Sequence, residues 1–253
     1  MKAKDFKCPF TWNDRRPLFF DRVLLVPEYY DRHAEEWSFP GWEDPLFFGR
    51  KDAPVYIEYC SGNGAWVIEK ARRHPEINWI AVEKRFDRVR KIWAKAKNFG
   101  LNNLIVVDGE AQPFTKYYLP EASVDGVYVN FPDPWPKERH AKHRLLQEPF
   151  ITDLARILKK GASAVFVTDD EQYCNQIISV MLDNGAWDSV IPKPFFSTEW
   201  KDYGTSFFDE LWRMKGRHIR YMQYIKTIGA EGFEPPTHCS QSSCASQTAL
   251  CSD

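Results

Sequence analysis

The sequence predicts an α/β fold in which a mostly parallel sheet is covered by helices on both faces and an antiparallel strand closes one edge. Two observations indicate this class. From about residue 54 onward, short apolar and β-prone runs alternate with longer segments of helical periodicity, as they do in proteins built on parallel sheets. The early β-prone runs also carry acidic residues at or near their ends, and the carboxyl ends of parallel strands are where such sheets bind ligands.

The expected elements follow this alternation in chain order. Strands are expected at residues 55–59, 78–83, 104–107, 124–129 and 162–168. Helices are expected at about residues 65–73, 85–98, 149–158 and 172–184. Residues 159–161 (Lys-Lys-Gly) match the usual C-terminal signals of a helix and are expected to close the third one. Aromatic and β-prone runs between 187 and 226, including 207–208 (Phe-Phe) and 219–225, predict a closing pair of strands.

The alternating region, residues 54–227, is expected to form one domain. Residues 1–53 mix aromatics, prolines and charges without a sustained period, and we interpret them as an extension that is either wrapped on the core or a partly disordered arm. Residues 228–253 lack an apolar period, so we expect disorder there. The run Gly-Phe-Glu-Pro-Pro at 232–236 can be encoded by DNA that contains the T-loop core of a tRNA gene. We therefore consider the hypothesis that this tail is a read-through product without a function of its own.

Composition restricts the function classes. The 34 Lys and Arg residues and 35 Asp and Glu residues give a formal net charge of −1, which argues against a surface coated throughout by polyanion but allows nucleic-acid binding through local patches. No secretory signal and no apolar run of membrane-spanning length is present in the sequence. The cysteines of the body are scattered, and those of the tail fit no usual zinc spacing. The sequence therefore predicts a cytoplasmic protein without a metal or a membrane partner.

A glycine-rich loop and three acids predict a nucleotide-type ligand. Gly62 and Gly64, between the first strand and the first helix, allow a tight turn and a close approach of backbone to ligand. Glu58 precedes them, where a carboxylate is unfavourable beside a pyrophosphate but suits the amino or sulfonium group of S-adenosylmethionine. Glu83 ends the second strand and is placed to accept hydrogen bonds from two ribose hydroxyls, and Asp108 ends the third strand, towards the adenine. Capping acids at solvent-facing strand ends remain the alternative for each acid taken singly.

Two other functional classes stay open at this point. The first is a nicotinamide-dependent oxidoreductase on the same architecture. Val67 argues against it, because it occupies the position of the third glycine of G-x-G-x-x-G. The sequence also has no obvious catalytic Tyr–Lys or His–acid pair. The second is a non-catalytic RNA-binding protein that retains the fold. The intact glycines and acids argue against this class, because a protein that had lost catalysis would not need them.

The stretch Asn130 to Arg144, N-F-P-D-P-W-P-K-E-R-H-A-K-H-R, follows the fourth strand. Its three prolines remove backbone donors and predict a stiff, extended loop that fixes Asp133 and Trp135. Trp135 either stacks on a base or packs the loop. The run that follows is basic and is expected to hold phosphates, chiefly through Lys137, Arg139, Lys142 and Arg144. The combination predicts a pocket for a planar base beside a phosphate-binding surface, with a proline-rich turn before a charged helix as the alternative.

These motifs resemble those of the class I methyltransferases that make N7-methylguanosine in the variable loop of tRNA. The resemblance covers roughly residues 50–226. It is carried by E-Y-C-S-G-N-G from Glu58, A-V-E ending at Glu83, the stretch from Asn130, V-T-D-D-E-Q-Y from Val167, and G-T-S-F-F-D-E-L-W with the following K-G-R-H-I. It implies a Rossmann-like class I methyltransferase fold, S-adenosylmethionine as cofactor and tRNA as partner. Whether the protein is a monomer or a homodimer stays open.

The resemblance also implies roles for single residues. Glu58, Glu83, Asp108 and Asp133 correspond to cofactor-contacting acids, and Asp133 is also assigned a catalytic role. Lys137, Asp169 and the segment from Thr205 correspond to substrate-contacting positions. We hypothesise that Asp133 and Asp169 accept hydrogen bonds from the N1–H and the amine of guanine, or alternatively that Asp133 mainly orients the cofactor. One position departs from the family pattern: Phe208 stands where an acid is common, and Asp209 and Glu210 follow it.

Overall fold

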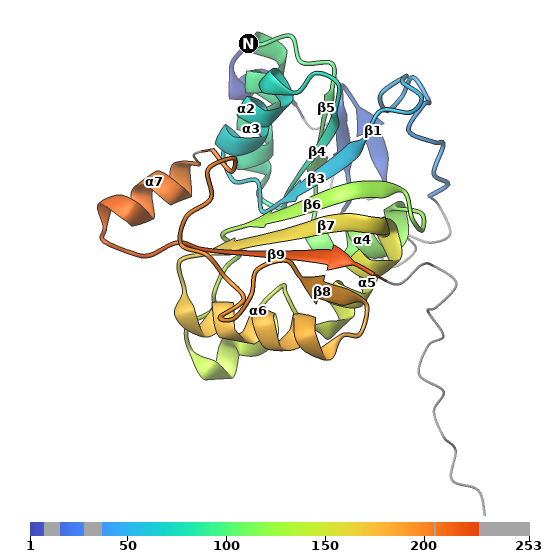
Figure 1. Ribbon diagram of the computed structural model, residues 1–253. Coiled ribbons are helices and arrows are strands. Elements are labelled where there is room, and N and C mark those ends of the chain that lie inside the picture. The colour runs from blue at the N-terminus through green and yellow to red at the C-terminus, as the bar shows by residue number, and fades with distance from the viewer. Residues whose placement is uncertain (8–15, 28–36, 205, 228–253) are drawn as a thin grey trace, which may run out of the picture.

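The computed structural model describes residues 1–7, 16–27, 37–204 and 206–227. Within them, nine strands form one sheet in the order β1-β2-β5-β4-β3-β6-β7-β9-β8 (Figure 1). The strands are β1 (Leu18–Phe20), β2 (Val23–Leu25), β3 (Val55–Tyr59), β4 (Asn78–Glu83), β5 (Leu104–Asp108), β6 (Val124–Asn130), β7 (Leu158–Thr168), β8 (Trp187–Ser189) and β9 (Arg220–Lys226). Strands β2 to β7 pair in parallel, while β1, β8 and β9 pair antiparallel. The predicted α/β fold with a mostly parallel sheet is confirmed.

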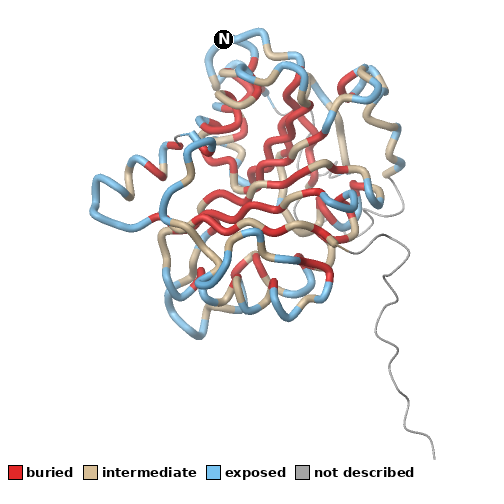
Figure 2. The backbone as a smooth tube through the Cα atoms, in the orientation of Figure 1, coloured by how far each residue is buried: buried red, intermediate tan, exposed pale blue. Residues whose placement is uncertain are grey.

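Helices cover both faces of this sheet. One face is packed by α2 (Ala65–Arg73) and α3 (Phe86–Asn98), and the other by α4 (Ala111–Tyr118), α5 (Glu148–Ile157) and α6 (Glu171–Asp183). Figure 2 shows the buried central strands between these layers. Helix α7 (Phe207–Met214) projects from the body of the domain (Figure 1), and two 3-10 turns, η1 (Ala3–Asp5) and η2 (Glu138–His143), complete the elements of the described residues. None of the helices in the described part of the chain has the length and apolar composition needed to cross a bilayer.

The apolar periodicity explains why the helices dock where they do. In α3, Val89, Ile92, Trp93 and Ala96 recur at helical spacing, and all four are buried against the sheet. Strand β4 is buried along its whole length, which is the pattern of a central parallel strand covered on both faces. The alternation of these two patterns is therefore what fixes the layered architecture.

The structure corrects the prediction for residues 159–161. They do not close a helix, because α5 ends at Ile157 and β7 begins at Leu158. Leu158 pairs with Val124, and the register then shifts before Gly126, so the strand pair is irregular at this point. Gly161, at φ 80°, lies within that irregular part of β7.

The prediction for residues 207–208 is also wrong, since they begin α7 rather than a strand. The side chain of Ser206 accepts a hydrogen bond from the backbone of Asp209 and caps this helix. The closing pair of strands is formed by β8 and β9 instead. Helix α4 was not predicted from the sequence.

Two short strands of the N-terminal segment belong to the sheet. Strand β2 pairs in parallel with β5, and β1 pairs with β2. The guanidinium of Arg22 donates to the main-chain oxygens of Phe47 and Asn102, which ties this segment to its neighbours. Strands β1 and β2 of this segment thus extend one edge of the sheet. The tail predicted at 228–253 lies outside the described residues.

The order of the strands defines where a ligand binds. Strand β3 pairs with β4 on one side and with β6 on the other, so the chain order reverses direction at β3. In open α/β sheets, ligands bind at such a reversal, outside the carboxyl ends of the strands. Glu58, Glu83, Asp108 and Asn130 lie at the carboxyl ends of β3, β4, β5 and β6. Parallel pairing therefore gathers the acids predicted from the sequence at one edge.

Candidate active site

The glycine loop turns sharply between β3 and α2. Cys60, Gly62 and Gly64 all have positive φ, and Gly64 is the N-cap residue of α2. The carboxylate of Glu83 holds the loop, because its Oε2 accepts a hydrogen bond of 2.8 Å from the Gly62 backbone N–H. Its Oε1 accepts one of 2.9 Å from the backbone of Arg85. Glu83 thus joins the glycine loop to the end of β4.

Gly64 is required by both its conformation and its surroundings. At φ 71° an L-residue is strained, and a Cβ there would lie 2.7 Å from Cγ1 of Ile92. We expect Gly64→Ala to lower the free energy of unfolding by about 2–4 kcal/mol, the sum of the conformational cost and of overpacking. Urea unfolding measures this.

A matched control is available in the same chain. Gly100 has a similar φ of 63°, but nothing lies within 4 Å of a Cβ built on it. Gly100→Ala is expected to cost only the conformational part, about 1–2 kcal/mol. Equal losses in the two variants would contradict the packing argument for the glycine loop.

Glu58 is fully buried beneath the loop. Its Oε1 accepts a hydrogen bond of 2.8 Å from the Asn130 side chain, whereas its Oε2 is buried and has no hydrogen-bond partner among the described residues. Burial, helped by the charge of Glu83, raises the pKa of Glu58 to about 7, although the hydrogen bonds from Asn130 and Ser61 oppose the shift. A buried carboxylate oxygen that lacks a donor fits the cationic amino group of S-adenosylmethionine.

Asp108 completes the acidic edge. It is the register partner of Glu83 across β4 and β5. Burial raises the pKa of Asp108 to about 7, and the charge of Glu83 adds to the shift. Burial and mutual repulsion make three neighbouring carboxylates unfavourable in their ionised form. A ligand with a positive charge and hydroxyl donors would relieve both effects, so the site favours such a ligand.

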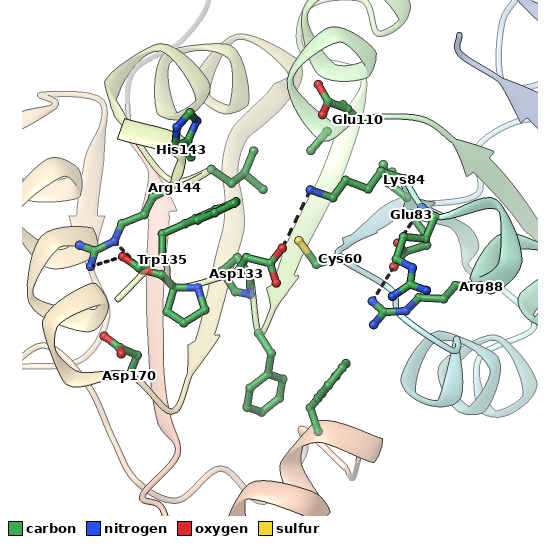
Figure 3. A pocket seen from close by; sticks show the side chains of 18 of the residues that line it. Cys60, Glu83, Lys84, Arg88, Glu110, Asp133, Trp135, His143, Arg144 and Asp170 are labelled. Atoms are coloured by element: carbon green, nitrogen blue, oxygen red, sulfur yellow. Dashed lines mark hydrogen bonds and ion pairs between the residues drawn. The ribbon is translucent and has the colours of Figure 1, made fainter. Parts of the chain in front are cut away.

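A cavity of about 720 Å³ opens beside this edge (Figure 3). Its size is typical of a pocket for a small organic ligand. It is lined from the strand ends, the proline-rich loop, the segment after β7 and helix α7. The lining residues used below are Glu83, Lys84, Asp133, Trp135, Arg144, Asp169, Phe208, Trp212 and Arg217. Glu58, Gly62, Gly64 and Asp108 are not among the residues that line it, and Lys137 and Arg139 lie exposed outside it.

Asp133 presents its carboxylate to this cavity. Its side chain is 72% exposed, and its Oδ2 lies 3.9 Å from Nζ of Lys84. Figure 3 shows the two side chains facing each other, one from the proline-rich loop and one from the end of β4. An ion pair this exposed is weak, so it leaves Asp133 accessible to a ligand.

Arg144 holds the proline-rich loop in place. Its guanidinium donates to the Pro134 carbonyl oxygen at 2.7 Å and to the side chain of Gln176, and it lies over the ring of Tyr173. Arg144 is only 9% exposed. The structure thus gives Arg144 internal partners while it also lines the cavity, and its predicted contact with phosphates stays a prediction, as do those of the exposed Lys137, Arg139 and Lys142. Sequence alone could not separate these cations, because burial depends on how η2 turns.

Trp135 packs within the loop. Its ring lies 5.3 Å from that of His143 and 5.9 Å from that of His140, measured between centroids. It also lines the cavity. Trp135 therefore makes the packing contacts of one interpretation, and its stacking on a base stays a prediction.

Neither acid that follows Phe208 takes the place of the acid that is common at that position. Asp209 is buried and accepts hydrogen bonds from Tyr221 at 2.6 Å and Arg213 at 2.7 Å, so its carboxylate serves the packing of α7. Glu210 is exposed and does not line the cavity. Phe208 itself lies over the glycine loop, 3.2 Å from a Cβ built on Gly62. Thr205 lies outside the described residues.

Two residues of the site were missed by the sequence analysis. Asn130 was quoted only as the start of a motif, but it is the hydrogen-bond donor to Glu58. Lys84 was not assigned to the site, but it is the cation beside Asp133. Both residues lie at or directly after the end of a strand, and this position could have identified them. Glu83 and Asp108 were identified because residues at the ends of parallel strands meet at one edge of the sheet.

This architecture is that of a Rossmann-like methyltransferase. The sequence family described as putative methyltransferases matches residues 52–219. Among solved structures, the 16S rRNA methyltransferase KamB has the same fold, with a TM-score of 0.53 and 17% identity over 76% of this chain and 96% of that one.

Curated relatives identify the family more narrowly. The tRNA (guanine-N(7)-)-methyltransferase of Chlamydia felis is 47% identical over 90% of this chain and 99% of its own length. That of Chlamydia trachomatis is 45% identical over 90% of this chain and all of its own, and that of Thermotoga maritima is 30% identical over 76% of this chain and 58% of its own. The chain belongs to the tRNA (guanine-N(7)-)-methyltransferase family. This membership favours the methyltransferase interpretation over the oxidoreductase and the non-catalytic RNA-binding protein.

Proposed function

We infer that the protein transfers a methyl group from S-adenosylmethionine to N7 of a guanine in tRNA. The variable loop as the place of that guanine, and the cytoplasm as the place of the reaction, are parts of the same proposal. The observation that carries it is the cavity that joins the acidic edge at Glu83 to the exposed carboxylate of Asp133. Beside it, Lys137, Arg139 and Lys142 form an exposed basic surface on the η2 segment.

The residues of the acidic edge bind the cofactor. The Oε2 of Glu58, which has no hydrogen-bond partner in the described part of the chain, accepts from the amino group. The backbone at Gly62 and Gly64 allows close approach, and Glu83 accepts from the ribose hydroxyls. Asp108 lies on the adenine side. S-adenosylmethionine supplies a methyl group on a positively charged sulfur, which is reactive without further activation by the protein.

The chemistry requires positioning rather than a strong base. Guanine N7 carries a lone pair and no proton, so it attacks the methyl carbon directly while the electron pair of the breaking bond goes to sulfur. Asp133 and Asp169 accept hydrogen bonds from the N1–H and the exocyclic amine, and this fixes the ring in line with the methyl group. The guanine becomes cationic as the bond forms, and nearby carboxylates stabilise that charge.

Methylation of tRNA transcripts tests this function. The full-length protein, an unmodified tRNA transcript and labelled S-adenosylmethionine are expected to give N7-methylguanosine after nuclease digestion and chromatography. A transcript made with 7-deazaguanosine has no N7 and is expected to remain unlabelled. Absence of N7-methylguanosine from every transcript, or equal labelling of the deaza transcript, would refute the proposal.

Charge reversal at Arg139 tests the RNA-binding surface. Because its side chain is exposed on η2 beside the cavity, Arg139→Glu is expected to weaken tRNA binding about 10-fold or more at low salt and less at high salt. The affinity for S-adenosylmethionine is expected to stay unchanged. Filter binding over a salt series measures the first quantity, and calorimetry measures the second.

Lys160→Glu is the matched control. Lys160 is equally exposed, but it lies in the first residues of β7, at the end of the sheet away from the carboxyl edge. The same change of charge there is expected to alter tRNA affinity less than 3-fold, because screening weakens exposed charges beyond about 10 Å. Similar losses for both variants would mean that net charge, and not the η2 surface, governs binding.

A further inference from the structure

Arg217 bridges two residues of the cavity wall. Its guanidinium forms an ion pair and hydrogen bond with the carboxylate of Asp169, and it lies 4.2 Å from the centroid of the Trp212 ring. All three side chains line the cavity that Asp133 also lines. The arrangement brings together an acid at the end of β7, an indole of α7 and a cation from the turn that follows α7.

The buried carboxylate of Asp169 is stabilised by Arg217. The side chain of Asp169 is only 8% exposed, whereas that of Arg217 is 49% exposed. The neighbouring Arg220 is directed elsewhere, since it donates to Glu171 at 3.0 Å and reaches only the main-chain oxygen of Asp169. A nearly buried carboxylate is costly without a donor. A ligand that donates to Asp169 therefore favours the departure of Arg217, because it replaces the donor that the carboxylate would lose.

The chemistry of that other group is constrained by what Arg217 presents. A guanidinium is planar, offers parallel N–H donors that match a carboxylate, and stacks on an aromatic ring. The Watson–Crick edge of guanine has the same features, with the N1–H and the exocyclic amine side by side on a planar ring. Adenine has an acceptor at N1, which a carboxylate repels. Of the nucleobases, guanine is thus the one whose Watson–Crick edge offers a carboxylate two adjacent donors on a ring that can also stack on Trp212.

We propose that Asp169 and Trp212 form the guanine-binding subsite and that Arg217 occupies it until the substrate guanine takes its place. This proposal rests on the function proposed above and specifies the residues that select the base. Trp212 supplies the stacking surface and Asp169 supplies the acceptor. The acid absent at Phe208 is then not needed, because the two α7 residues that line the cavity are Phe208 and Trp212, and Phe208 covers the glycine loop.

Nucleoside binding to the full-length protein tests the role of Arg217. Removal of the competing guanidinium in Arg217→Ala is expected to tighten guanosine binding at least 10-fold over the wild type in equilibrium dialysis, and to leave adenosine binding unchanged. Adding Asp169→Asn to that variant is expected to remove the gain. Lys215→Ala is the matched control, because Lys215 also lies near the Trp212 ring, at 4.8 Å, but does not pair with Asp169. An unchanged guanosine affinity, or an equal gain for adenosine, would overturn the proposal.

Substitution of Trp212 tests the stacking surface. Trp212→Ala is expected to raise the KM for tRNA about 5- to 150-fold, the range of base–aromatic stacking, with little change in cofactor affinity. Trp212→Phe is expected to restore most of the loss, and Phe207→Ala, an exposed aromatic on the same helix that does not line the cavity, is expected to have no effect. A tryptophan needed only for folding would lower Tm and cofactor affinity together and would contradict the subsite.

The two proposals fail separately. If the wild type forms no N7-methylguanosine in tRNA, the proposed function fails. If the wild type methylates tRNA normally while Trp212→Ala keeps its KM and Arg217→Ala gains no guanosine affinity, only the guanine subsite fails.

Discussion

Replacing Asp133 by alanine is expected to lower kcat for tRNA methylation by about 100-fold or more while tRNA affinity stays within about 3-fold. The carboxylate lies in the cavity wall, held by a loop that Arg144 fixes from behind. Its proposed task is to hold the guanine in line with the methyl group, and a small misplacement of reacting atoms costs on the order of 100-fold in rate. The affinity for tRNA depends instead on phosphate contacts outside the cavity and on the stacking proposed for Trp212, neither of which Asp133 provides. Single-turnover kinetics with saturating tRNA measure the effect.

Two further measurements divide the possible roles of Asp133. If it orients the base, Asp133→Ala retains its affinity for S-adenosylmethionine, and if it orients the cofactor, that affinity falls in step with kcat. Glu138→Ala provides the control, because Glu138 is an exposed acid on the following turn and does not line the cavity. It is expected to retain kcat. Full activity in Asp133→Ala would remove this residue from the chemistry altogether.

Much of the candidate site was predictable because strand ends are predictable. Once the alternation of strands and helices indicates a parallel sheet, the residues that follow each apolar run must meet at one edge. Glu58, Glu83 and Asp108 were assigned on that ground, and the register of β3, β4 and β5 places them together. The proline-rich loop was predictable for a similar reason, since three prolines restrict the backbone whatever surrounds it.

The features that the sequence did not reveal depend on tertiary contacts. Arg144 and Arg139 are alike in a basic run, and only the turn of η2 buries one and exposes the other. Strands β1 and β2 have three residues each, too few for a period to be recognised, and they are stabilised because β2 pairs with β5 and β1 pairs with β2. The Phe-Phe pair that begins α7 has strand propensity, which the Ser206 cap and the buried Asp209 override.

Glu58→Gln is expected to weaken cofactor binding and, at alkaline pH, to stabilise the free protein. The loss of the negative charge removes the partner of the cofactor's amino group, so the affinity for S-adenosylmethionine is expected to fall at least 10-fold at pH 7.5, the usual cost of removing a charged partner. Glu138→Gln is expected to retain that affinity. Isothermal titration calorimetry measures both.

The effect on stability has a sign that follows from the pKa of Glu58. Burial raises that pKa from 4.5 to about 7, so the folded protein binds the proton more tightly than the unfolded chain does. The free energy of unfolding therefore falls as pH rises between these two values, and above pH 7 the ionised Glu58 side chain destabilises the folded protein. Between pH 5 and pH 8 the wild type is expected to lose about 2–3 kcal/mol of unfolding free energy relative to Glu58→Gln.

The difference in unfolding free energy between the wild type and Glu58→Gln reports the titration of Glu58 alone. Asp108, whose pKa is also raised to about 7, titrates in both proteins, and the amide of glutamine has the same cost at every pH, so neither changes the difference. Urea unfolding at pH 5 and pH 8 measures it. A variant that loses cofactor affinity while gaining relative stability towards pH 8 would mean that the buried carboxylate serves the ligand at the expense of the fold. A difference that does not change with pH would instead mean that Glu58 is already ionised at pH 5 in the folded protein, and the argument for an unpartnered buried oxygen awaiting a cation would fail.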